Sequence, residues 1–221
     1  MIVLGLTGSI GMGKSTAARM LKAMGAPVCD SDAVVHGLLG RGGRAVPAIG
    51  AAFPGVVIDG AVSRPALGAA VFRDPGALKR LEAILHPMVQ AAQRDFLARA
   101  ARRGARIAVL DIPLLFETRG ERRVDATVVV SAPLAVQRAR VLARPGMTAE
   151  KFAGILARQM PDVEKRRRAD YVVPTGGGRL MTRRALQGIV RDVARRKGRR
   201  KGRHWPPRGY QPGQVGQDHH A

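Results

Sequence analysis

The sequence has 221 residues, with 38 Lys and Arg against 16 Asp and Glu, which gives a formal net charge of +22. This length is enough for one domain, or one domain with an insert, and for a core that needs no disulfide or metal to hold it together. Cys29 is the only cysteine, which excludes an internal disulfide and a multi-cysteine zinc site and fits a reducing compartment. The excess of positive charge favours anionic partners such as nucleotides, phosphorylated cofactors and nucleic acids.

No segment has the pattern of a membrane span or of a secretory signal. The longest uncharged run, residues 45–58, is interrupted by Pro47 and Pro54 and is too short to cross a bilayer. The apolar N-terminus has no preceding charge and no segment typical of a cleavage site. We therefore expect a soluble protein of the cytoplasm with no membrane partner.

The first hundred residues predict two short strands, three helical stretches and a loop. The strands are continuous apolar runs without alternation, which is typical of parallel strands covered on both faces. From the N-terminus, the elements are the strand Ile2–Leu6, the helix Lys14–Met24, the strand Pro27–Cys29, a helix over residues 34–39, a loop rich in Gly and Pro over 40–60, and a mostly helical stretch over 64–101.

The rest of the sequence continues the alternation of strands and helices. Thr148 is a suitable N-cap for one of these helices, because its hydroxyl can accept a main-chain N–H. The elements are the strand Ile107–Leu110, the strand Ala126–Val130, the helix Pro133–Ala143, a helix after Thr148, the strand Tyr171–Val173 and an amphipathic helix over 180–193. This order predicts an α/β domain around a parallel sheet of five strands with helices on both faces.

A phosphate-binding loop is indicated by Gly8–Ser15, in which Gly is followed by four residues and then Gly-Lys-Ser. It follows a predicted strand and opens a predicted helix, as this pattern requires. Glycines let the main chain wrap phosphate oxygens, and the N–H groups of the loop and of the helix N-terminus point at the anion. We expect Lys14 to reach the β- and γ-phosphates and the Ser15 hydroxyl to bind Mg²⁺. The predicted nucleotide-binding residues here are Gly8, Gly11, Met12, Gly13, Lys14, Ser15 and Thr16, although Thr16 can equally be an ordinary residue of the first helical turn.

Carboxylates follow the ends of two predicted strands. Asp30 and Asp32 come directly after the second strand, and ligands of open α/β sheets bind outside the carboxyl ends of the strands. Either carboxylate is ionised at neutral pH and can accept a hydroxyl proton, whereas Asp30 can also be mainly the N-cap of the helix that follows. Asp111 follows the next strand and either binds Mg²⁺ through water or is a turn residue.

A set of polar side chains shares one face of the helix over 133–143. Gln137, Arg140 and Arg144 are spaced by three and four residues, and a Pro-Gly break and a second helix follow them. This arrangement predicts a lid, residues 138–160, whose guanidinium groups neutralise charge that develops on a transferred phosphate. The alternative is a solvated basic face, since Arg is abundant throughout the chain.

Several motifs together resemble the dephospho-CoA kinase family over about residues 2–195. The P-loop alone is shared by many proteins, whereas the other motifs are specific in order and spacing. The matching runs are Leu6-Thr7-Gly8-Ser9-Ile10-Gly11-Met12-Gly13-Lys14-Ser15, Asp30-Ser31-Asp32-Ala33, His86-Pro87-Met88-Val89, Asp111-Ile112-Pro113-Leu114-Leu115-Phe116-Glu117, and Gln137 with Arg140 and Arg144.

This resemblance implies a P-loop kinase fold and transfer of the γ-phosphoryl group of ATP to the 3′-hydroxyl of dephospho-CoA, the last step of coenzyme A synthesis. It implies that Asp32 is the catalytic carboxylate, and that Lys14 and Arg140 are the cations that stabilise the phosphates. Arg140 and Asp32 then also contact the substrate, and Arg144 contacts ATP. The segment 36–102 corresponds to a helical substrate domain, where His86-Pro87 would begin a helix and His86 would help to shape the acceptor pocket or make a structural contact. His36 and Cys29 are interpreted as packing residues.

The sequence departs from the family pattern in three places. Pro174-Thr175 stands where the family usually has Asp-Asn or Asp-Thr, which weakens any role of this turn in adenine binding. Ser9 stands where Gly is commonest. The tail after about residue 200 is not a family feature. Residues 196–221 have the composition of a disordered tail, basic and then rich in Pro, Gly and Gln.

Three other functions are compatible with parts of the sequence. A kinase for a nucleoside, a nucleotide or shikimate would also use the P-loop and the aspartate pair. A nucleic-acid-binding NTPase would use the basic tail for nonspecific polyanion contacts. The simpler interpretation is that the tail is solvated and binds nothing. A binding module for CoA or an acyl carrier has little use for Lys14, Ser15 and Asp32 together.

Overall fold

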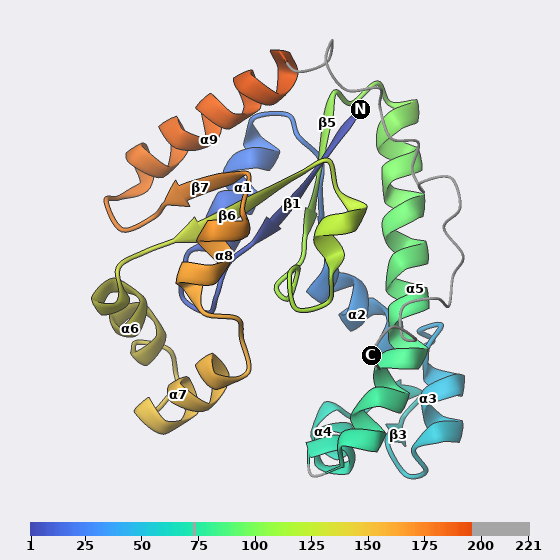
Figure 1. Ribbon diagram of the computed structural model, residues 1–221. Helices are drawn as coiled ribbons and strands as arrows, with labels where there is room; N and C mark the ends of the chain where they lie inside the picture. The colour runs from blue at the N-terminus through green and yellow to red at the C-terminus, as the bar shows by residue number, and fades with distance from the viewer. Residues whose placement is uncertain (73, 196–221) are drawn as a thin grey trace, which may run out of the picture. The chain divides into compact units, whose positions relative to one another are not determined.

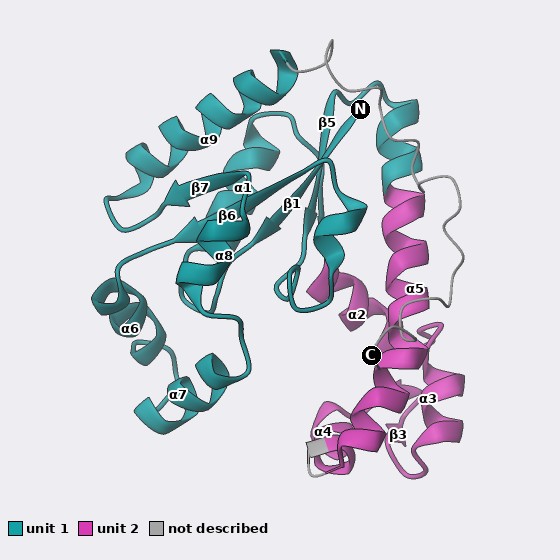
Figure 2. Cartoon of the chain, in the orientation of Figure 1, with its two compact units in different colours: residues 1–29, 97–207 teal, residues 30–96, 208–221 magenta. Residues whose placement is uncertain are grey.

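The computed structural model describes residues 1–72 and 74–195. Within these, the chain divides into two compact units: residues 1–29 and 97–195 belong to the first, and residues 30–72 and 74–96 to the second (Figure 2). The predicted tail, residues 196–221, and its proposed polyanion contacts lie outside the described residues.

A parallel sheet of five strands forms the centre of the first unit (Figure 1). Its order is β2-β5-β1-β6-β7, so β1 lies in the middle, paired in parallel with β5 and β6. The five predicted strands are therefore confirmed, and their ends shift by no more than a residue or two. The strands are β1 (Ile2–Thr7), β2 (Val28–Asp30), β5 (Ile107–Asp111), β6 (Ala126–Ser131) and β7 (Tyr171–Pro174).

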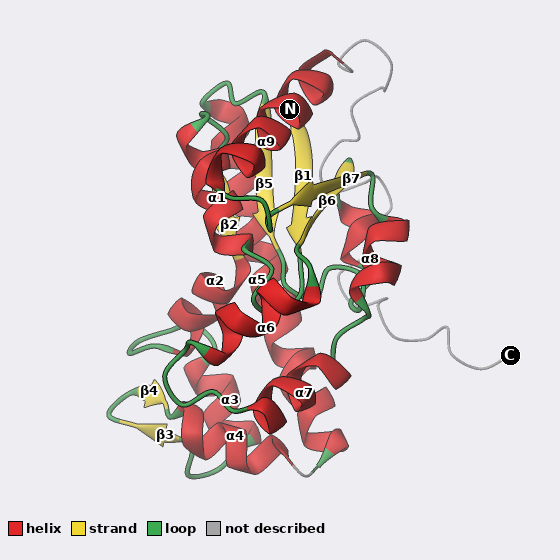
Figure 3. Ribbon diagram, turned by 90° about the vertical axis from the view of Figure 1, so that its left-hand side faces the viewer, coloured by secondary structure: helices red, strands yellow, loops and turns green. Residues whose placement is uncertain are grey.

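Helices cover both faces of this sheet, as predicted (Figure 3). On one face, α1 (Lys14–Ala23) and α9 (Arg179–Arg195) bury a cluster that includes Leu6 and Val128 of the strands with Leu21 and Leu186 of the helices. On the other face lies α8 (Asp162–Arg168), beside β6.

The remaining helices of the first unit follow β5 and β6. They are the 3₁₀ turn η1 (Gly120–Arg123), α6 (Leu134–Leu142) and α7 (Ala149–Ala157). The predicted cap of α7 is confirmed, because the Thr148 hydroxyl accepts Lys151 N at 3.3 Å. The sequence pattern did not predict α8, since four of its seven residues are basic and its Val163 is exposed, which leaves no apolar stripe to detect.

The second unit is built from helices and one small hairpin. Its core includes Leu39, Ile49, Phe53, Val62 and Leu67. The elements are α2 (Ser31–Leu39), α3 (Val46–Ala52), β3 (Val57–Ile58), β4 (Ala61–Val62), α4 (Arg64–Phe72) and α5 (Pro75–Arg102), the last of which continues into the first unit.

The interpretation of residues 40–60 as loop was wrong, because this stretch contains α3 and the first strand of the β3–β4 hairpin. Pro47 lies at the start of α3, where a missing N–H costs nothing. The hairpin turns through Asp59 and Gly60, which have φ of 50° and 74°. An Asp-Gly pair at positive φ suits a two-residue hairpin turn.

The interpretation of His86-Pro87 as the start of a helix was also wrong, because Pro87 lies inside α5. The helix begins instead at Pro75, where the Asp74 carboxylate accepts Gly76 N at 2.7 Å. Main-chain hydrogen bonds from Ala77 and Gly76 lower the pKa of Asp74. Pro is favoured at the first position of a helix, and the sequence offered two such positions, of which Pro75 is the one preceded by a capping Asp.

Candidate active site

The phosphate-binding loop connects β1, which ends at Thr7, to α1, which begins at Lys14. Gly11 and Gly13 have φ of 76° and 86°, values that side chains with a Cβ rarely adopt. A Cβ on Gly8 would lie 2.4 Å from Val130 Cγ2. Three glycines of the predicted motif are therefore required by main-chain conformation or by close packing against β6.

Met12 holds the middle of the loop against the sheet. Its side chain is buried, and its Sδ accepts a hydrogen bond from Ala132 N at 3.0 Å. Its carbonyl oxygen accepts the Thr175 hydroxyl at 2.7 Å. Because the Met12 side chain points into the core, only the main chain of this residue is available for the predicted contact with a nucleotide.

Lys14 forms an ion pair with Asp111, whose carboxylate oxygen lies 2.5 Å from Lys14 Nζ. Both side chains are largely buried, with 16% of Lys14 and 4% of Asp111 exposed. Asp111 is the last residue of β5, the neighbour of β1 in the sheet. The carboxylate that the sequence offered as a magnesium ligand or turn residue therefore also orients the lysine of the P-loop.

Arg140 lies beside the P-loop, where α6 presents it to the turn after β7. Its guanidinium donates to Thr175 O at 2.6 Å, to the Thr175 hydroxyl at 3.3 Å and to Gly11 O at 3.5 Å. The buried Gln137, one turn earlier, donates to Ile10 O at 2.7 Å. Arg144 lies just beyond the end of α6 and is exposed.

Thr175 connects several parts of this site although the sequence did not identify it as a site residue. It is 5% exposed, and its hydroxyl and carbonyl groups contact the P-loop residue Met12 and the side chain of Arg140. The sequence did carry one signal, because Thr175 directly follows the fifth predicted strand. We interpreted Pro174-Thr175 only as a departure from the family motif.

Ser15 and Thr16 lie in the first turn of α1, directly after Lys14. Ser15 is exposed, and its carbonyl accepts Arg19 Nε at 3.4 Å. The Thr16 hydroxyl accepts the Arg19 guanidinium, also at 3.4 Å. Hydroxyl and carboxylate oxygens are the ligands that Mg²⁺ prefers, so an exposed Ser15 and the strand-end Asp111 have the donor chemistry that such an ion requires. Among the described residues, no group of three or more His, Cys, Asp or Glu could hold a metal ion by itself.

Three predicted site residues belong to the second unit. The Asp30 carboxylate accepts Asp32 N at 2.9 Å and Ala33 N at 3.2 Å, which confirms its interpretation as the N-cap of α2. Asp32 is exposed in the first turn of that helix, and the buried Ser31 between them accepts Gln93 Nε2 at 3.0 Å. His86 is exposed on α5. The catalytic role of Asp32 and the substrate contact of His86 stay predictions.

The two residues interpreted as packing residues differ. Cys29 is buried in β2, as predicted. His36 is not a packing residue, because it is exposed and its Nδ1 lies 2.5 Å from the Arg64 guanidinium.

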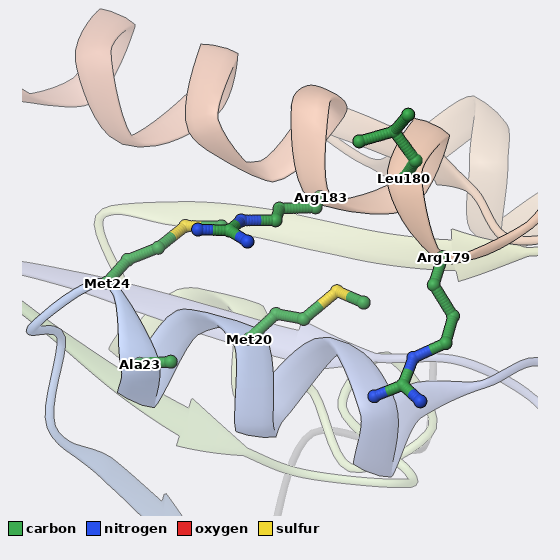
Figure 4. A pocket seen from close by; sticks show the side chains of 6 residues that line it. All are labelled: Met20, Ala23, Met24, Arg179, Leu180 and Arg183. Atoms are coloured by element: carbon green, nitrogen blue, oxygen red, sulfur yellow. The ribbon is translucent and has the colours of Figure 1, made fainter.

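A separate surface pocket of about 380 Å³ lies between α1 and α9 (Figure 4). Two arginines and four apolar residues line it: Met20, Ala23, Met24, Arg179, Leu180 and Arg183. None of them belongs to the P-loop, so the candidate active site is identified by the loop and its contacts and not by this pocket. In residues 1–72 and 74–195, no helix has the length and apolar character needed to cross a membrane.

Known proteins resemble this chain over most of its length. A family model described as dephospho-CoA kinase matches residues 2–179. A dephospho-CoA kinase of Mesorhizobium japonicum is 58% identical over 198 residues, which cover 90% of this chain and all of the relative. One of Paramagnetospirillum magneticum is 67% identical over 166 residues, 75% of this chain and 78% of the relative.

Solved structures show the same fold. A Thermus thermophilus protein has a TM-score of 0.75 at 38% identity and covers 86% of this chain and 97% of its own. A dephospho-CoA kinase from Campylobacter jejuni has a TM-score of 0.58 at 20% identity, with 87% and 97% covered. The predicted P-loop kinase fold is thereby confirmed.

Proposed function

This chain belongs to the dephospho-CoA kinase family, and we propose that it transfers the γ-phosphoryl group of ATP to the 3′-hydroxyl of the dephospho-CoA ribose. The observation that carries the proposal is the P-loop with its Lys14–Asp111 pair at the carboxyl end of the central strands. That edge is where parallel α/β sheets bind their ligands.

The P-loop binds the phosphates of ATP in this proposal. Glycines at positive φ aim successive main-chain N–H groups at one anion, and the N-terminus of α1 adds its partial positive charge. Lys14 contributes a full positive charge at the β- and γ-phosphates. Asp111 supports this role, because it holds Lys14 Nζ beside the loop in an environment with little water.

Arg140 stabilises the charge that moves onto the phosphates as the bond between the γ-phosphorus and the β–γ bridging oxygen breaks. Its three contacts with Gly11 and Thr175 support this role, because they keep the guanidinium next to the loop. The exposed Arg144 is proposed to contact ATP from the lid, residues 138–160.

Asp32 accepts the proton of the 3′-hydroxyl while the hydroxyl oxygen attacks the γ-phosphorus and ADP leaves. This assignment is supported by the exposure of Asp32 at the start of α2, where the Asp30 carboxylate fixes its main chain. We propose that the segment 36–102 binds dephospho-CoA, with His86 at the acceptor pocket. Location in the cytoplasm stays a prediction of the sequence.

Mg²⁺ would be held by the Ser15 hydroxyl, with Asp111 acting through water. When bound, such an ion neutralises the charge of the β- and γ-phosphates. The support for this part of the proposal is the exposed hydroxyl at the start of α1 and the carboxylate at the end of the neighbouring strand.

The test is an assay of purified protein with ATP, Mg²⁺ and separate acceptors: dephospho-CoA, a nucleoside and shikimate. We expect ADP and coenzyme A, identified by mass spectrometry, with dephospho-CoA alone. Phosphorylation of only the nucleoside or only shikimate would refute the assignment of the substrate.

A further inference from the structure

Ile10 of the P-loop is held by two glutamine side chains from distant parts of the first unit. Its N–H donates to Gln159 Oε1 at 3.1 Å, and its carbonyl oxygen accepts Gln137 Nε2 at 2.7 Å. The two glutamines come from different segments, one from α6 and one from the connection between α7 and α8. Both main-chain polar groups of one residue in the phosphate-binding loop are therefore fixed from outside the loop.

A buried ion pair fixes the segment that carries Gln159. The next residue, Met160, donates its N–H to Glu117 Oε1 at 2.9 Å. Lys165 Nζ lies 2.9 Å from the same oxygen, and the Lys165 side chain is completely buried. Lys165 lies in the middle of α8, so one carboxylate oxygen connects that helix to the residue beside Gln159.

The far end of this connection is attached to the sheet. Asp162, in the first turn of α8, accepts the Ser131 hydroxyl at 2.7 Å, and Ser131 is the last residue of β6. Gln159 thus lies between α7, which precedes it, and Met160, which is held by Glu117 and leads into α8. Such a support restricts where the Gln159 side chain can lie, as a second layer of contacts does around other binding sites.

We infer that Gln159 is a positioning residue for the P-loop, and that the Glu117–Lys165 pair and Met160 N hold Gln159 in place. The hydrogen bond to Ile10 N reduces the conformational freedom of a loop that has two glycines at positive φ, so less ordering remains when phosphates bind. The inference rests on the proposed function only in taking the loop to be a nucleotide site.

The direct test replaces Gln159 by Met, which removes the acceptor and keeps the length of the side chain. Binding of ADP is measured by calorimetry, and the melting temperature by circular dichroism. One hydrogen bond corresponds to a rise of about five- to tenfold in the dissociation constant of ADP. Since Gln159 is only half-buried, we expect the melting temperature to change little.

The matched control is Gln187→Met, because Gln187 is a half-buried glutamine on α9. It should leave the affinity for ADP unchanged. An unchanged affinity for ADP in folded Gln159→Met would overturn the inference, as would an equal loss in both variants.

Two double variants test the supporting ion pair, because Glu117→Gln alone leaves a buried lysine without its partner and is at risk of not folding. Glu117→Gln with Lys165→Met removes both charges and retains an oxygen for Met160 N. Glu117→Leu with Lys165→Met removes that oxygen as well. We expect near-normal ADP affinity in the first pair and a loss of about five- to tenfold in the second.

Equal affinities for ADP in the two double variants would remove Glu117 from the inference. All these measurements use ADP alone, so they remain valid whichever acceptor the enzyme phosphorylates. In the turnover assay, Gln159→Met should raise the KM for ATP and leave the KM for dephospho-CoA unchanged. Failure of the wild-type protein to phosphorylate dephospho-CoA would refute the proposed function and not this inference.

Discussion

Thr175 holds the main chain of the P-loop through its hydroxyl, and replacing it by Val removes this group while keeping the shape of the side chain. The hydroxyl lies 2.7 Å from Met12 O and 3.1 Å from Ser131 O. Ser131 O also accepts Thr175 N at 2.8 Å and keeps that partner in the variant. The substitution therefore leaves Met12 O, within the P-loop, without this partner. It also removes the 3.3 Å contact of the Arg140 guanidinium, which keeps its bond to Thr175 O.

A buried acceptor that loses its partner costs about 1–3 kcal/mol. We expect Thr175→Val to lower the free energy of unfolding by about this amount and to weaken ADP binding, because Met12 O can then find a new partner only if the loop moves. Urea unfolding followed by circular dichroism measures the first effect, and calorimetry with ADP measures the second.

Thr182→Val is the matched control for this prediction. Thr182 is also buried, and its hydroxyl lies 3.1 Å from Pro174 O and 3.0 Å from Gly178 O, so it ties the same turn without touching the P-loop. It should lose stability and retain affinity for ADP. The reasoning fails if Thr175→Val binds ADP as tightly as the wild type, or if the two variants lose affinity equally.

Further substitutions probe the loop, the proposed catalytic carboxylate and the start of α5. Gly11→Ala places a Cβ 2.5 Å from Val141 Cγ2 at a φ of 76°, so it should lower the free energy of unfolding by about 2–5 kcal/mol and remove most of the affinity for ADP. The control Gly146→Ala has a φ of 70° and open space around it, so it should lower the free energy of unfolding only by the conformational part, about 1–2 kcal/mol. Equal unfolding midpoints of the two variants would contradict this. Asp32→Asn should keep ATP affinity and lower kcat at least about a hundredfold, and a retained kcat in the coupled assay would exclude Asp32 as the base. Asp74→Ala should lower the melting temperature at neutral pH, because the pKa of Asp74 is lowered in the folded protein by the hydrogen bonds from Ala77 and Gly76. This stabilisation is complete above the unfolded pKa and is lost as the pH falls through the folded pKa, so the two melting curves should converge in acid, and a constant difference would argue against the cap.

The sequence predicted the first unit well because its signals are local. Each strand is a short run of apolar residues, and the P-loop is a contiguous pattern between a strand and a helix, so the positions of Gly11, Gly13 and Lys14 follow from the motif. The Asp30 cap and the Thr148 cap are likewise decided within three residues of each other along the chain.

Other features depend on contacts that no local pattern reveals. The Ile10–Gln159 hydrogen bond joins residues far apart in the sequence, and a lone glutamine after a helix carries no signal of its partner. Two missed features did have local signals. The Asp59-Gly60 turn lay within a stretch whose Gly and Pro content pointed to loop, and the Asp74-Pro75 start of α5 was passed over in favour of Pro87.

The central claim is that the loop Gly8–Ser15 binds the phosphates of the nucleotide. A crystal structure of the protein with ADP and Mg²⁺ tests it most directly. We predict the β-phosphate within hydrogen-bonding distance of main-chain N–H groups of this loop and of Lys14 Nζ. Nucleotide bound elsewhere, for example in the pocket between α1 and α9, with the loop making no phosphate contact, would contradict it.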